Sequence, residues 1–267
     1  MNKALSGAQV LVTRPDHQAE NLCSLIEQQG GVAVRFPTLQ IVGLDKLASA
    51  TNPLTKLSNV QWLIFTSVNA VNFALKAIGG KIAQLKTTQI AAIGKATARE
   101  LESAGLQVSM TPKEGYDSEA LLAMPQMQQV NGQGIVVVRG QGGREELANV
   151  LRGRGAYVDY WEVYKRVIPD VDSSGVIDLL EQDKLDAVIV TSFEALQNLV
   201  AMLGATHQQR LANVPLVVIS ERIRWLAAEM GFTRIAVAES PSDPAILDTV
   251  CALINECSRK RGIEWQN

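Results

Sequence analysis

The chain has 267 residues, of which 47% are hydrophobic and 19% charged, and this composition is typical of a folded globular protein. Its formal net charge of −2 gives no overall basic field that would recruit nucleic acid, and no stretch approaches the roughly 18 apolar residues of a membrane span. The N-terminus lacks an apolar run of signal-peptide length, and the three cysteines lack a paired spacing, so we expect a reduced, cytoplasmic protein.

Short apolar runs rich in valine and isoleucine alternate with amphipathic stretches from one end of the chain to the other. Several runs show no polar alternation, which is typical of parallel strands covered on both faces. The alternation predicts an α/β protein with open parallel sheets and helices on both faces. The predicted strands are Val10–Thr13, Trp62–Phe65, Ile90–Ile93, Ile135–Val138, Ala187–Val190 and Leu216–Ile219.

The second half of the chain repeats the first with an offset of 125 or 126 residues. Six landmarks recur in the same order, which indicates an internal duplication rather than two unrelated α/β halves. Each copy consists of a strand-helix-strand part, about 8–40 or 134–168, and a longer αβ part, about 58–128 or 186–257. The landmark pairs are Arg14 and Arg139, Gly30 and Gly155, Thr66 and Thr191, Ile93 and Ile219, Gly105 and Gly231, and Asp117 and Asp243.

Two assemblies of these parts are compatible with the repeat. Each copy could fold alone, with a boundary near residue 131, or the first part of one copy could complete the second part of the other. Two extended segments, Phe36–Gly43 and Trp161–Pro169, occupy matching positions and could cross side by side as paired connectors. The residues alone do not choose between the two assemblies.

Small polar residues follow the predicted strands, where open parallel sheets bind their ligands. Such residues can cap the next helix or donate hydrogen bonds to an anion at its N-terminus. We therefore expect an anion site built from the strand-to-helix turns of both copies. The candidates on residue type are Thr66, Ser67, Thr191 and Ser192, together with Gly94, Lys95 and Thr97 of the turn Ile93–Arg99.

A third turn, Arg139-Gly140-Gln141-Gly142-Gly143-Arg144, is rich in glycine. It has neither the Lys-Ser/Thr ending of a nucleotide-binding P-loop nor a convincing dinucleotide pattern, so a cradle of backbone N–H groups for an oxyanion fits it better. Tyr164 lies in the second connector. Its neutral phenol could donate a proton to a leaving oxygen, or it could pack with Trp161 and Phe36 as hinge core. His17 and His207 are far apart, which excludes a histidine-rich metal site.

Taken together, these motifs resemble the uroporphyrinogen-III synthase family, over about residues 8–255. The order and spacing of the motifs carry the resemblance, because each motif is weak alone. They are Leu11-Val12-Thr13-Arg14-Pro15, Phe65-Thr66-Ser67-Val68-Asn69-Ala70-Val71, Ala92-Ile93-Gly94-Lys95-Ala96-Thr97-Ala98, Arg139-Gly140-Gln141-Gly142-Gly143-Arg144-Glu145, Val163-Tyr164-Lys165-Arg166, Val190-Thr191-Ser192 and Val218-Ile219-Ser220-Glu221-Arg222.

The resemblance implies the interleaved assembly, with residues 1–37 and 169–267 in one domain, 38–168 in the other, connectors near 36–43 and 161–169, and a cleft between the domains. It also implies a lyase reaction of haem biosynthesis that uses no cofactor and no metal. The linear tetrapyrrole hydroxymethylbilane loses its hydroxyl and closes to uroporphyrinogen III, with ring D inverted through a spiro intermediate. The octacarboxylate substrate needs many hydrogen-bond donors from a nearly neutral protein.

The resemblance also implies roles for single residues. Tyr164 is the expected proton donor to the leaving hydroxyl. The expected substrate-binding residues are Arg14, Thr66, Ser67, Gly94, Lys95, Thr97, Arg139, Gly140, Thr191, Ser192 and Ser220. The chain departs from the family at Ser220-Glu221-Arg222, where many relatives have a Gly-x-Thr-Ala turn, so Glu221 is expected to point away from the substrate or to cap its helix.

A second hypothesis is a non-catalytic two-domain sensor that closes around a small polyanion, since this architecture would serve either function. We expect a monomer without nucleic-acid or membrane partners, because no heptads or long exposed apolar stripes are present. A transient hand-over of the unstable substrate by the preceding enzyme is left open.

Overall fold

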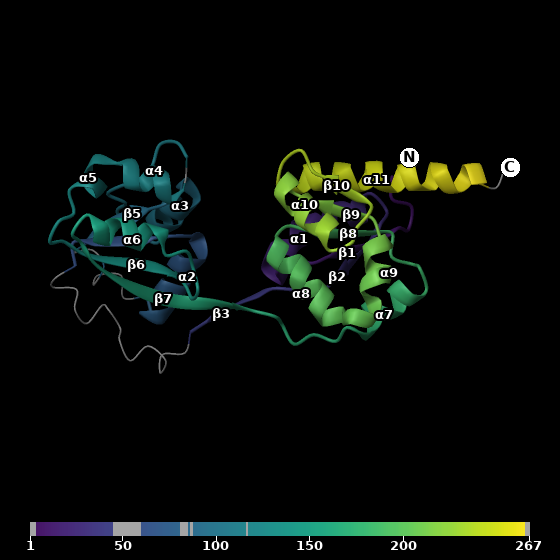
Figure 1. The fold of residues 1–267 in the computed structure, drawn as a ribbon, viewed down its shortest axis with the longest axis horizontal. Coiled ribbons are helices and arrows are strands. Elements are labelled where there is room, and N and C mark those ends of the chain that lie inside the picture. Colours follow the sequence, from purple (N-terminus) through teal and green to yellow (C-terminus); the bar gives the residue numbers. More distant parts are fainter. Residues whose placement is uncertain (1–3, 45–59, 81–84, 86–87, 116, 265–267) are drawn as a thin grey trace. The chain divides into compact units, whose positions relative to one another are not determined.

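The computed structural model describes residues 4–44, 60–80, 85, 88–115 and 117–264, and residues 256–264 enter only as part of a helix. It divides into two compact units, Met1–Gln40 with Val167–Asn267 (unit 1) and Ile41–Arg166 (unit 2). Each unit contains one five-stranded sheet, with helices on both sides of it (Figure 1).

The sheet of unit 1 is parallel and has the strand order β10-β9-β8-β1-β2. Val10, Val12 and Ile189 face helices α1 and α11, whereas Leu11 and Val188 point to the other face, where α7, α8, α9 and α10 pack. Burial of both faces explains why its inner strands are uniformly apolar. The elements are β1 (Gln9–Val12), α1 (Asp16–Gln28), β2 (Val32–Arg35), α7 (Ser174–Glu181), β8 (Ala187–Val190), α8 (Phe193–Leu203), η3 (Ala205–His207), α9 (Gln208–Asn213), β9 (Leu216–Val218), α10 (Glu221–Glu229), β10 (Ile235–Val237) and α11 (Asp243–Glu264).

Unit 2 repeats this arrangement with the strand order β3-β7-β6-β4-β5. Leu63 and Val136 lie on the face covered by α2 and α3, while Ile64 and Val137 lie on the face covered by α4, α5 and α6. A single parallel bridge between Ala91 and Met110 extends the sheet beyond β5. The elements are β3 (Gln40–Gly43), β4 (Trp62–Phe65), α2 (Val68–Ala77), β5 (Gln89–Ala92), α3 (Lys95–Ser103), α4 (Ser118–Ala123), α5 (Pro125–Gln128), β6 (Gly134–Gly140), α6 (Glu146–Gly153) and β7 (Tyr157–Val167).

The predicted α/β class is confirmed, and each of the six predicted strands is present to within three residues at either end. In each sheet the strand-helix-strand part of one copy pairs with the αβ part of the other, because β1 pairs with β8 and β6 pairs with β4. The two predicted connectors contribute β3 and the end of β7, which are hydrogen-bonded neighbours in the sheet of unit 2.

The pairing of β6 with β7 contains a bulge next to the glycine-rich turn. Arg139 pairs with Glu162, but the next residue, Gly140, pairs with Tyr164, so β7 has one extra residue at Val163. A bulge turns the following side chain toward a new direction. Tyr164 consequently joins the same core cluster as Val163 instead of the opposite face, and it lies against Gly140.

In the described part of the chain, no helix is both long and apolar enough to cross a membrane. Cys23 is buried and Cys251 partly buried, and both are free thiols that pack in the core between α1 and α11. The side chain of Cys257 lies outside the described residues.

Candidate functional site

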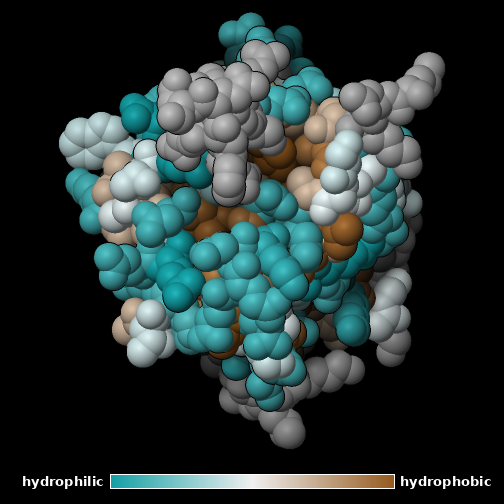
Figure 2. Space-filling view, turned by 90° about the vertical axis from the view of Figure 1, so that its right-hand side faces the viewer, coloured by the Kyte–Doolittle hydropathy of each residue, from teal (hydrophilic) through white to brown (hydrophobic). Residues whose placement is uncertain are grey.

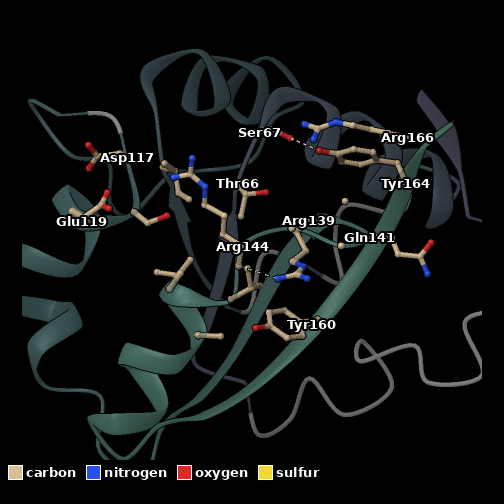
Figure 3. Close-up of a pocket in the computed structure, with 18 residues that line it drawn as sticks. Thr66, Ser67, Asp117, Glu119, Arg139, Gln141, Arg144, Tyr160, Tyr164 and Arg166 are labelled. Carbon is tan, nitrogen blue, oxygen red and sulfur yellow. Dashed lines mark hydrogen bonds between the residues drawn. The ribbon is translucent and has the colours of Figure 1, made fainter. Parts of the chain in front are cut away.

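A pocket of about 520 Å³ opens in unit 2 at the carboxyl ends of its strands. Both its volume and its position are typical of small-molecule sites in open parallel sheets. The end of β4 and the turn after β6 face the start of α4 across it (Figure 3). The lining residues are Thr66, Ser67, Ile93, Asp117, Ser118, Glu119, Val137, Arg139, Gly140, Gln141, Gly142, Gly143, Arg144, Leu147, Ala148, Tyr160, Tyr164 and Arg166.

Tyr164 is held rigidly at the pocket wall. Only 5% of the residue is exposed, its ring lies 5.6 Å from the ring of Phe73, and its hydroxyl is 3.3 Å from Oγ of Ser67. A Cβ on Gly140 would lie 2.5 Å from the Tyr164 ring, so glycine is needed there for close approach. Tyr164 packs in one cluster with Trp161, as the packing hypothesis expects, but Phe36 belongs to the core of unit 1. The hydroxyl nevertheless remains at the pocket.

The two residues after β4 use their hydroxyl groups differently. Ser67 caps α2, because its Oγ accepts a hydrogen bond from the backbone N–H of Ala70 at 3.1 Å. Capping uses an oxygen lone pair and leaves the hydroxyl proton for Tyr164 or for a ligand. Thr66 Oγ1 instead donates to the carbonyl of Val138 at 3.1 Å. In this conformation Thr66 has no proton to offer an anion, contrary to its expected donor role.

Arg139, the expected anion ligand of the glycine-rich turn, is buried and surrounded by carboxylates. Its Nη2 lies 3.3 Å from Oε1 of Glu145 and 3.4 Å from Oε1 of Glu162. Its Nη1 donates to the carbonyl of Arg144 at 3.0 Å, and its guanidinium stacks 4.0 Å above the ring of Tyr160. Two acidic neighbours offset its charge, so its attraction for a distant anion is weak.

The turn between β5 and α3 contributes only Ile93 to the pocket lining. Gly94 is the N-cap of α3 in an extended conformation, Lys95 is the first helical residue, and Thr97 is 5% exposed. The three residues expected to bind an anion are thus in place at a helix N-terminus, but they lie outside the pocket.

The equivalent turns of unit 1 are also at strand ends. Ser192 caps α8 by accepting from the N–H of Ala195 at 3.1 Å, and Ser220 caps α10 by accepting from that of Ile223 at 3.4 Å. Thr191 precedes Ser192 directly after β8. Glu221 pairs with Arg224 on the exposed side of α10, which agrees with the expectation that it does not face an anion.

Arg14, expected to bind substrate, is instead paired with Asp243 at the start of α11. Both side chains are largely buried, at 12% and 17% exposure, and Nδ2 of Asn21 donates to the same carboxylate at 2.6 Å. This ion pair ties β1 to α11 within unit 1. The charge of Arg14 is therefore already paired within the protein.

Several pocket residues were not among the expected ligands, and two of them, Arg144 and Tyr160, interact directly with the glycine-rich turn or with Arg139. Arg144 ends the glycine-rich turn, and in Figure 3 its side chain extends from the turn into the pocket. Tyr160 and Glu145 hold Arg139 from below, with the Tyr160 hydroxyl donating to Oε2 of Glu145 at 2.7 Å. The glycine-rich turn itself was the available signal for Arg144. The role of Tyr160 depends on the pairing of β6 with β7, which residue types do not reveal.

The pocket combines cationic and anionic walls. Arg144 and Arg166 lie on the side of β6 and β7, whereas Asp117 and Glu119 lie at the start of α4. Asp117 also caps that helix, since its Oδ1 accepts from Ala120 at 2.7 Å. Among the described residues, no group of three or more histidine, cysteine, aspartate or glutamate side chains is placed to hold a metal ion.

The fold and this pocket define a two-unit α/β protein with a pocket of small-molecule size at the ends of parallel strands. The family model described as "Uroporphyrinogen-III synthase HemD" matches residues 20–248. The uroporphyrinogen-III synthase of Escherichia coli is 31% identical over 240 residues, covering 89% of this chain and 98% of the relative. That of Salmonella typhimurium is 31% identical over 247 residues, with 89% and 98% covered. The chain belongs to the uroporphyrinogen-III synthase family.

Solved structures agree on the fold. A mutant uroporphyrinogen III synthase from Thermus thermophilus has a TM-score of 0.63 at 19% identity, covering 94% of this chain and 100% of the other. The enzyme from Helicobacter pylori has a TM-score of 0.63 at 15% identity, covering 92% and 99%. Members of this family are lyases that cyclise hydroxymethylbilane in haem biosynthesis, and the alternative of a non-catalytic sensor is not favoured.

Proposed function

We propose that this chain converts hydroxymethylbilane to uroporphyrinogen III at the pocket of unit 2, with Tyr164 as the proton donor to the leaving hydroxyl. The observation that carries the proposal is the placement of the Tyr164 hydroxyl, which lies at the pocket wall beside Oγ of Ser67. The ring is fixed between Gly140 and Phe73, and such fixed placement favours directed proton transfer.

The reaction balances with one proton transferred and one water released. The phenol of Tyr164 gives its proton to the hydroxyl of the substrate, and the C–O bond breaks. Water departs, and the remaining substrate is an electrophilic azafulvene. The substituted carbon of ring D attacks to form the spiro intermediate. The older bond from that carbon to the methylene of ring C then breaks, and the methylene bonds to the free α-carbon of ring D. The proton lost from this α-carbon restores the phenol. Ser67 can donate to the phenol oxygen while that oxygen carries negative charge, because capping leaves its own proton unused.

Several strand-end turns are proposed to bind the carboxylates of the substrate. The hydroxyls of Ser67, Ser192 and Ser220 support this role, because each accepts a capping hydrogen bond and keeps a proton to donate. Thr191, Gly94, Lys95, Thr97 and Gly140 are proposed from their positions at helix starts and in the turn after β6. Thr66 and Arg14 have the weakest support, since the Thr66 hydroxyl donates to the Val138 carbonyl and the charge of Arg14 is paired with Asp243.

Replacing Tyr164 by phenylalanine tests the catalytic assignment. The ring and its packing remain, so Tyr164→Phe should keep the melting temperature and lower kcat by about 100-fold, at the lower end of general-acid effects. Tyr157→Phe is the matched control, because Tyr157 is 76% exposed on the same strand and outside the pocket. Wild-type turnover by Tyr164→Phe would remove Tyr164 from the mechanism.

We also propose that the protein is a cytoplasmic monomer. The two free thiols support a reducing compartment. The face shown in Figure 2 is mainly hydrophilic, with apolar residues visible between polar ones, which favours a monomer. Sedimentation of the purified protein at the mass of a dimer would contradict the monomer proposal.

A further inference from the structure

A chain of polar contacts within unit 2 supports the turn Gly140–Arg144, which follows β6. We call this chain, formed by Tyr160, Glu145 and Arg139, the brace. The Tyr160 hydroxyl donates to one oxygen of Glu145, and the other oxygen of Glu145 lies 3.3 Å from Nη2 of Arg139. Arg139 in turn donates to the carbonyl of Arg144 at the far end of the turn. The contacts therefore run from β7 through Glu145 and Arg139 to the loop itself.

The two terminal nitrogens of Arg139 are engaged by protein groups and are suited to bracing the turn, whereas its Nε has no hydrogen-bond partner. Its side chain is only 6% exposed, and Glu145 and Glu162 offset its charge. A buried guanidinium is costly unless its donors and its charge are satisfied, so the positions of its partners fix its own position. The ring of Tyr160 adds a cation–π contact at 4.0 Å, which keeps the guanidinium flat against β7.

The protonation states of the brace suit this arrangement. Burial, followed by the contact with Glu145, raises the pKa of Tyr160, so the phenol remains a donor near neutral pH. The hydrogen bond from Tyr160 lowers the pKa of Glu145, so the carboxylate remains an acceptor. Neutral pH therefore keeps the whole chain of contacts intact.

The turn held by this brace has unused donors. Within the described residues, Arg139 Nε is one of two buried side-chain polar atoms without a hydrogen-bond partner, and it faces Gly143, whose ideal Cβ would lie 3.4 Å away. Gly142 has a φ of +73°, and among the described residues the backbone N–H groups of Gly142 and Gly143 make no backbone hydrogen bond. An unpaired buried donor in a pocket wall calls for an acceptor, and a substrate carboxylate supplies one.

We propose that Tyr160 and Glu145 are positioning residues that hold Arg139 under the turn Gly140–Arg144, and that the turn so held binds one carboxylate of the substrate. The inference rests on the proposed function, since it assigns residues to the same pocket. Tyr160 and Glu145 act through Arg139, which distinguishes them from Tyr164, whose hydroxyl is at the reacting group.

The test is a comparison of KM and kcat across four variants, with hydroxymethylbilane as substrate. Tyr160→Phe removes the hydrogen bond to Glu145 but keeps the ring under Arg139, and Tyr160→Leu removes both. Arg139→Lys keeps the charge but loses the fork that reaches both the loop carbonyl and the carboxylates. Tyr157→Phe is the control, being the same change on an exposed residue of the same strand.

We expect KM to rise about threefold to tenfold in Tyr160→Phe and further in Tyr160→Leu, with kcat within about twofold of wild type. Arg139→Lys should raise KM by about tenfold or more, and Tyr157→Phe should match wild type. The inhibition constant of added uroporphyrinogen III should weaken in parallel with KM, which a loss of stability alone would not produce. Melting temperatures identify any variant that fails to fold, and the partly buried Tyr160 is a safer site than the buried Arg139.

Two results would overturn the positioning role. One is a wild-type KM in both Tyr160→Leu and Arg139→Lys. The other is a fall in kcat that follows the melting temperature while KM stays constant. Failure of the proposed function looks different, because the wild-type protein itself would then produce only the uninverted type I ring.

Discussion

Gly140→Ala should displace the proposed proton donor without changing any polar group. The added Cβ would lie 2.5 and 2.6 Å from Cε2 and Cζ of Tyr164 and 3.0 Å from its hydroxyl oxygen. Carbon atoms in contact normally stay about 3.5 Å or more apart, so the ring must move by about 1 Å. Gly140 does not have a positive φ, so alanine suits the backbone and the clash with Tyr164 is the main effect.

The ring has little room to move, because it is buried in the cluster with Phe73 and Trp161. Overpacking of this kind costs about 1–3 kcal/mol of folding free energy. A misplacement of about 1 Å at a reacting group lowers turnover by about 100-fold. We therefore expect Gly140→Ala to remain folded, to lose a few degrees in melting temperature and to lose about two orders of magnitude in kcat.

The assay follows the rate of type III product from fresh hydroxymethylbilane, alongside thermal unfolding. Gly153→Ala is the matched control: it lies at the end of α6, and a Cβ there meets nothing within 4 Å. Replacing glycine by alanine in a helix should leave activity unchanged and stabilise the protein slightly. A Gly140→Ala variant with wild-type kcat would refute the claim that the position of Tyr164 governs turnover.

Three further changes test separate contacts. Ser67→Ala should lower kcat about threefold to tenfold through loss of the contact with Tyr164, and should cost about 1 kcal/mol of stability as a lost cap; unchanged kcat would limit Ser67 to capping. Asp243→Asn should lower the free energy of unfolding by about 1–3 kcal/mol in urea titrations, because it leaves Arg14 largely buried without its charge partner; an unchanged midpoint would contradict this. Burial raises the pKa of the Cys23 thiol, so Cys23 of the folded protein should react with iodoacetamide at pH 8 far more slowly than Cys23 of the protein unfolded in urea. Mass spectrometry follows the labelling, and fast labelling of the folded protein would contradict the buried placement.

Much of the fold is predictable from the chain because its signals are local. Apolar runs such as Ala187–Val190 are strands buried on both faces, and the repeat fixes which strands correspond. The pairing between copies is not local. Residues of β1 pair with residues of β8 more than 170 positions away, and the residue pattern left both assemblies open until the family resemblance favoured one.

The sequence predicts where the candidate site lies better than it predicts which side chains contact one another there. Strand ends and glycines indicated where Gly140, Ser67 and Tyr164 would lie, and the structure brings these three together. The ion pair of Arg14 could not be predicted, because its partner Asp243 is 229 positions away in the sequence. The bulge at Val163, which turns Tyr164 toward Gly140, depends on strand register and leaves no trace in residue types.

The most direct test of the account is the isomer of the ring that the wild-type protein makes. Freshly prepared hydroxymethylbilane is incubated with and without the protein, and the products are oxidised and separated by chromatography. We expect mainly the type III isomer with protein and the type I isomer without it. Type I ring alone in both samples would contradict it.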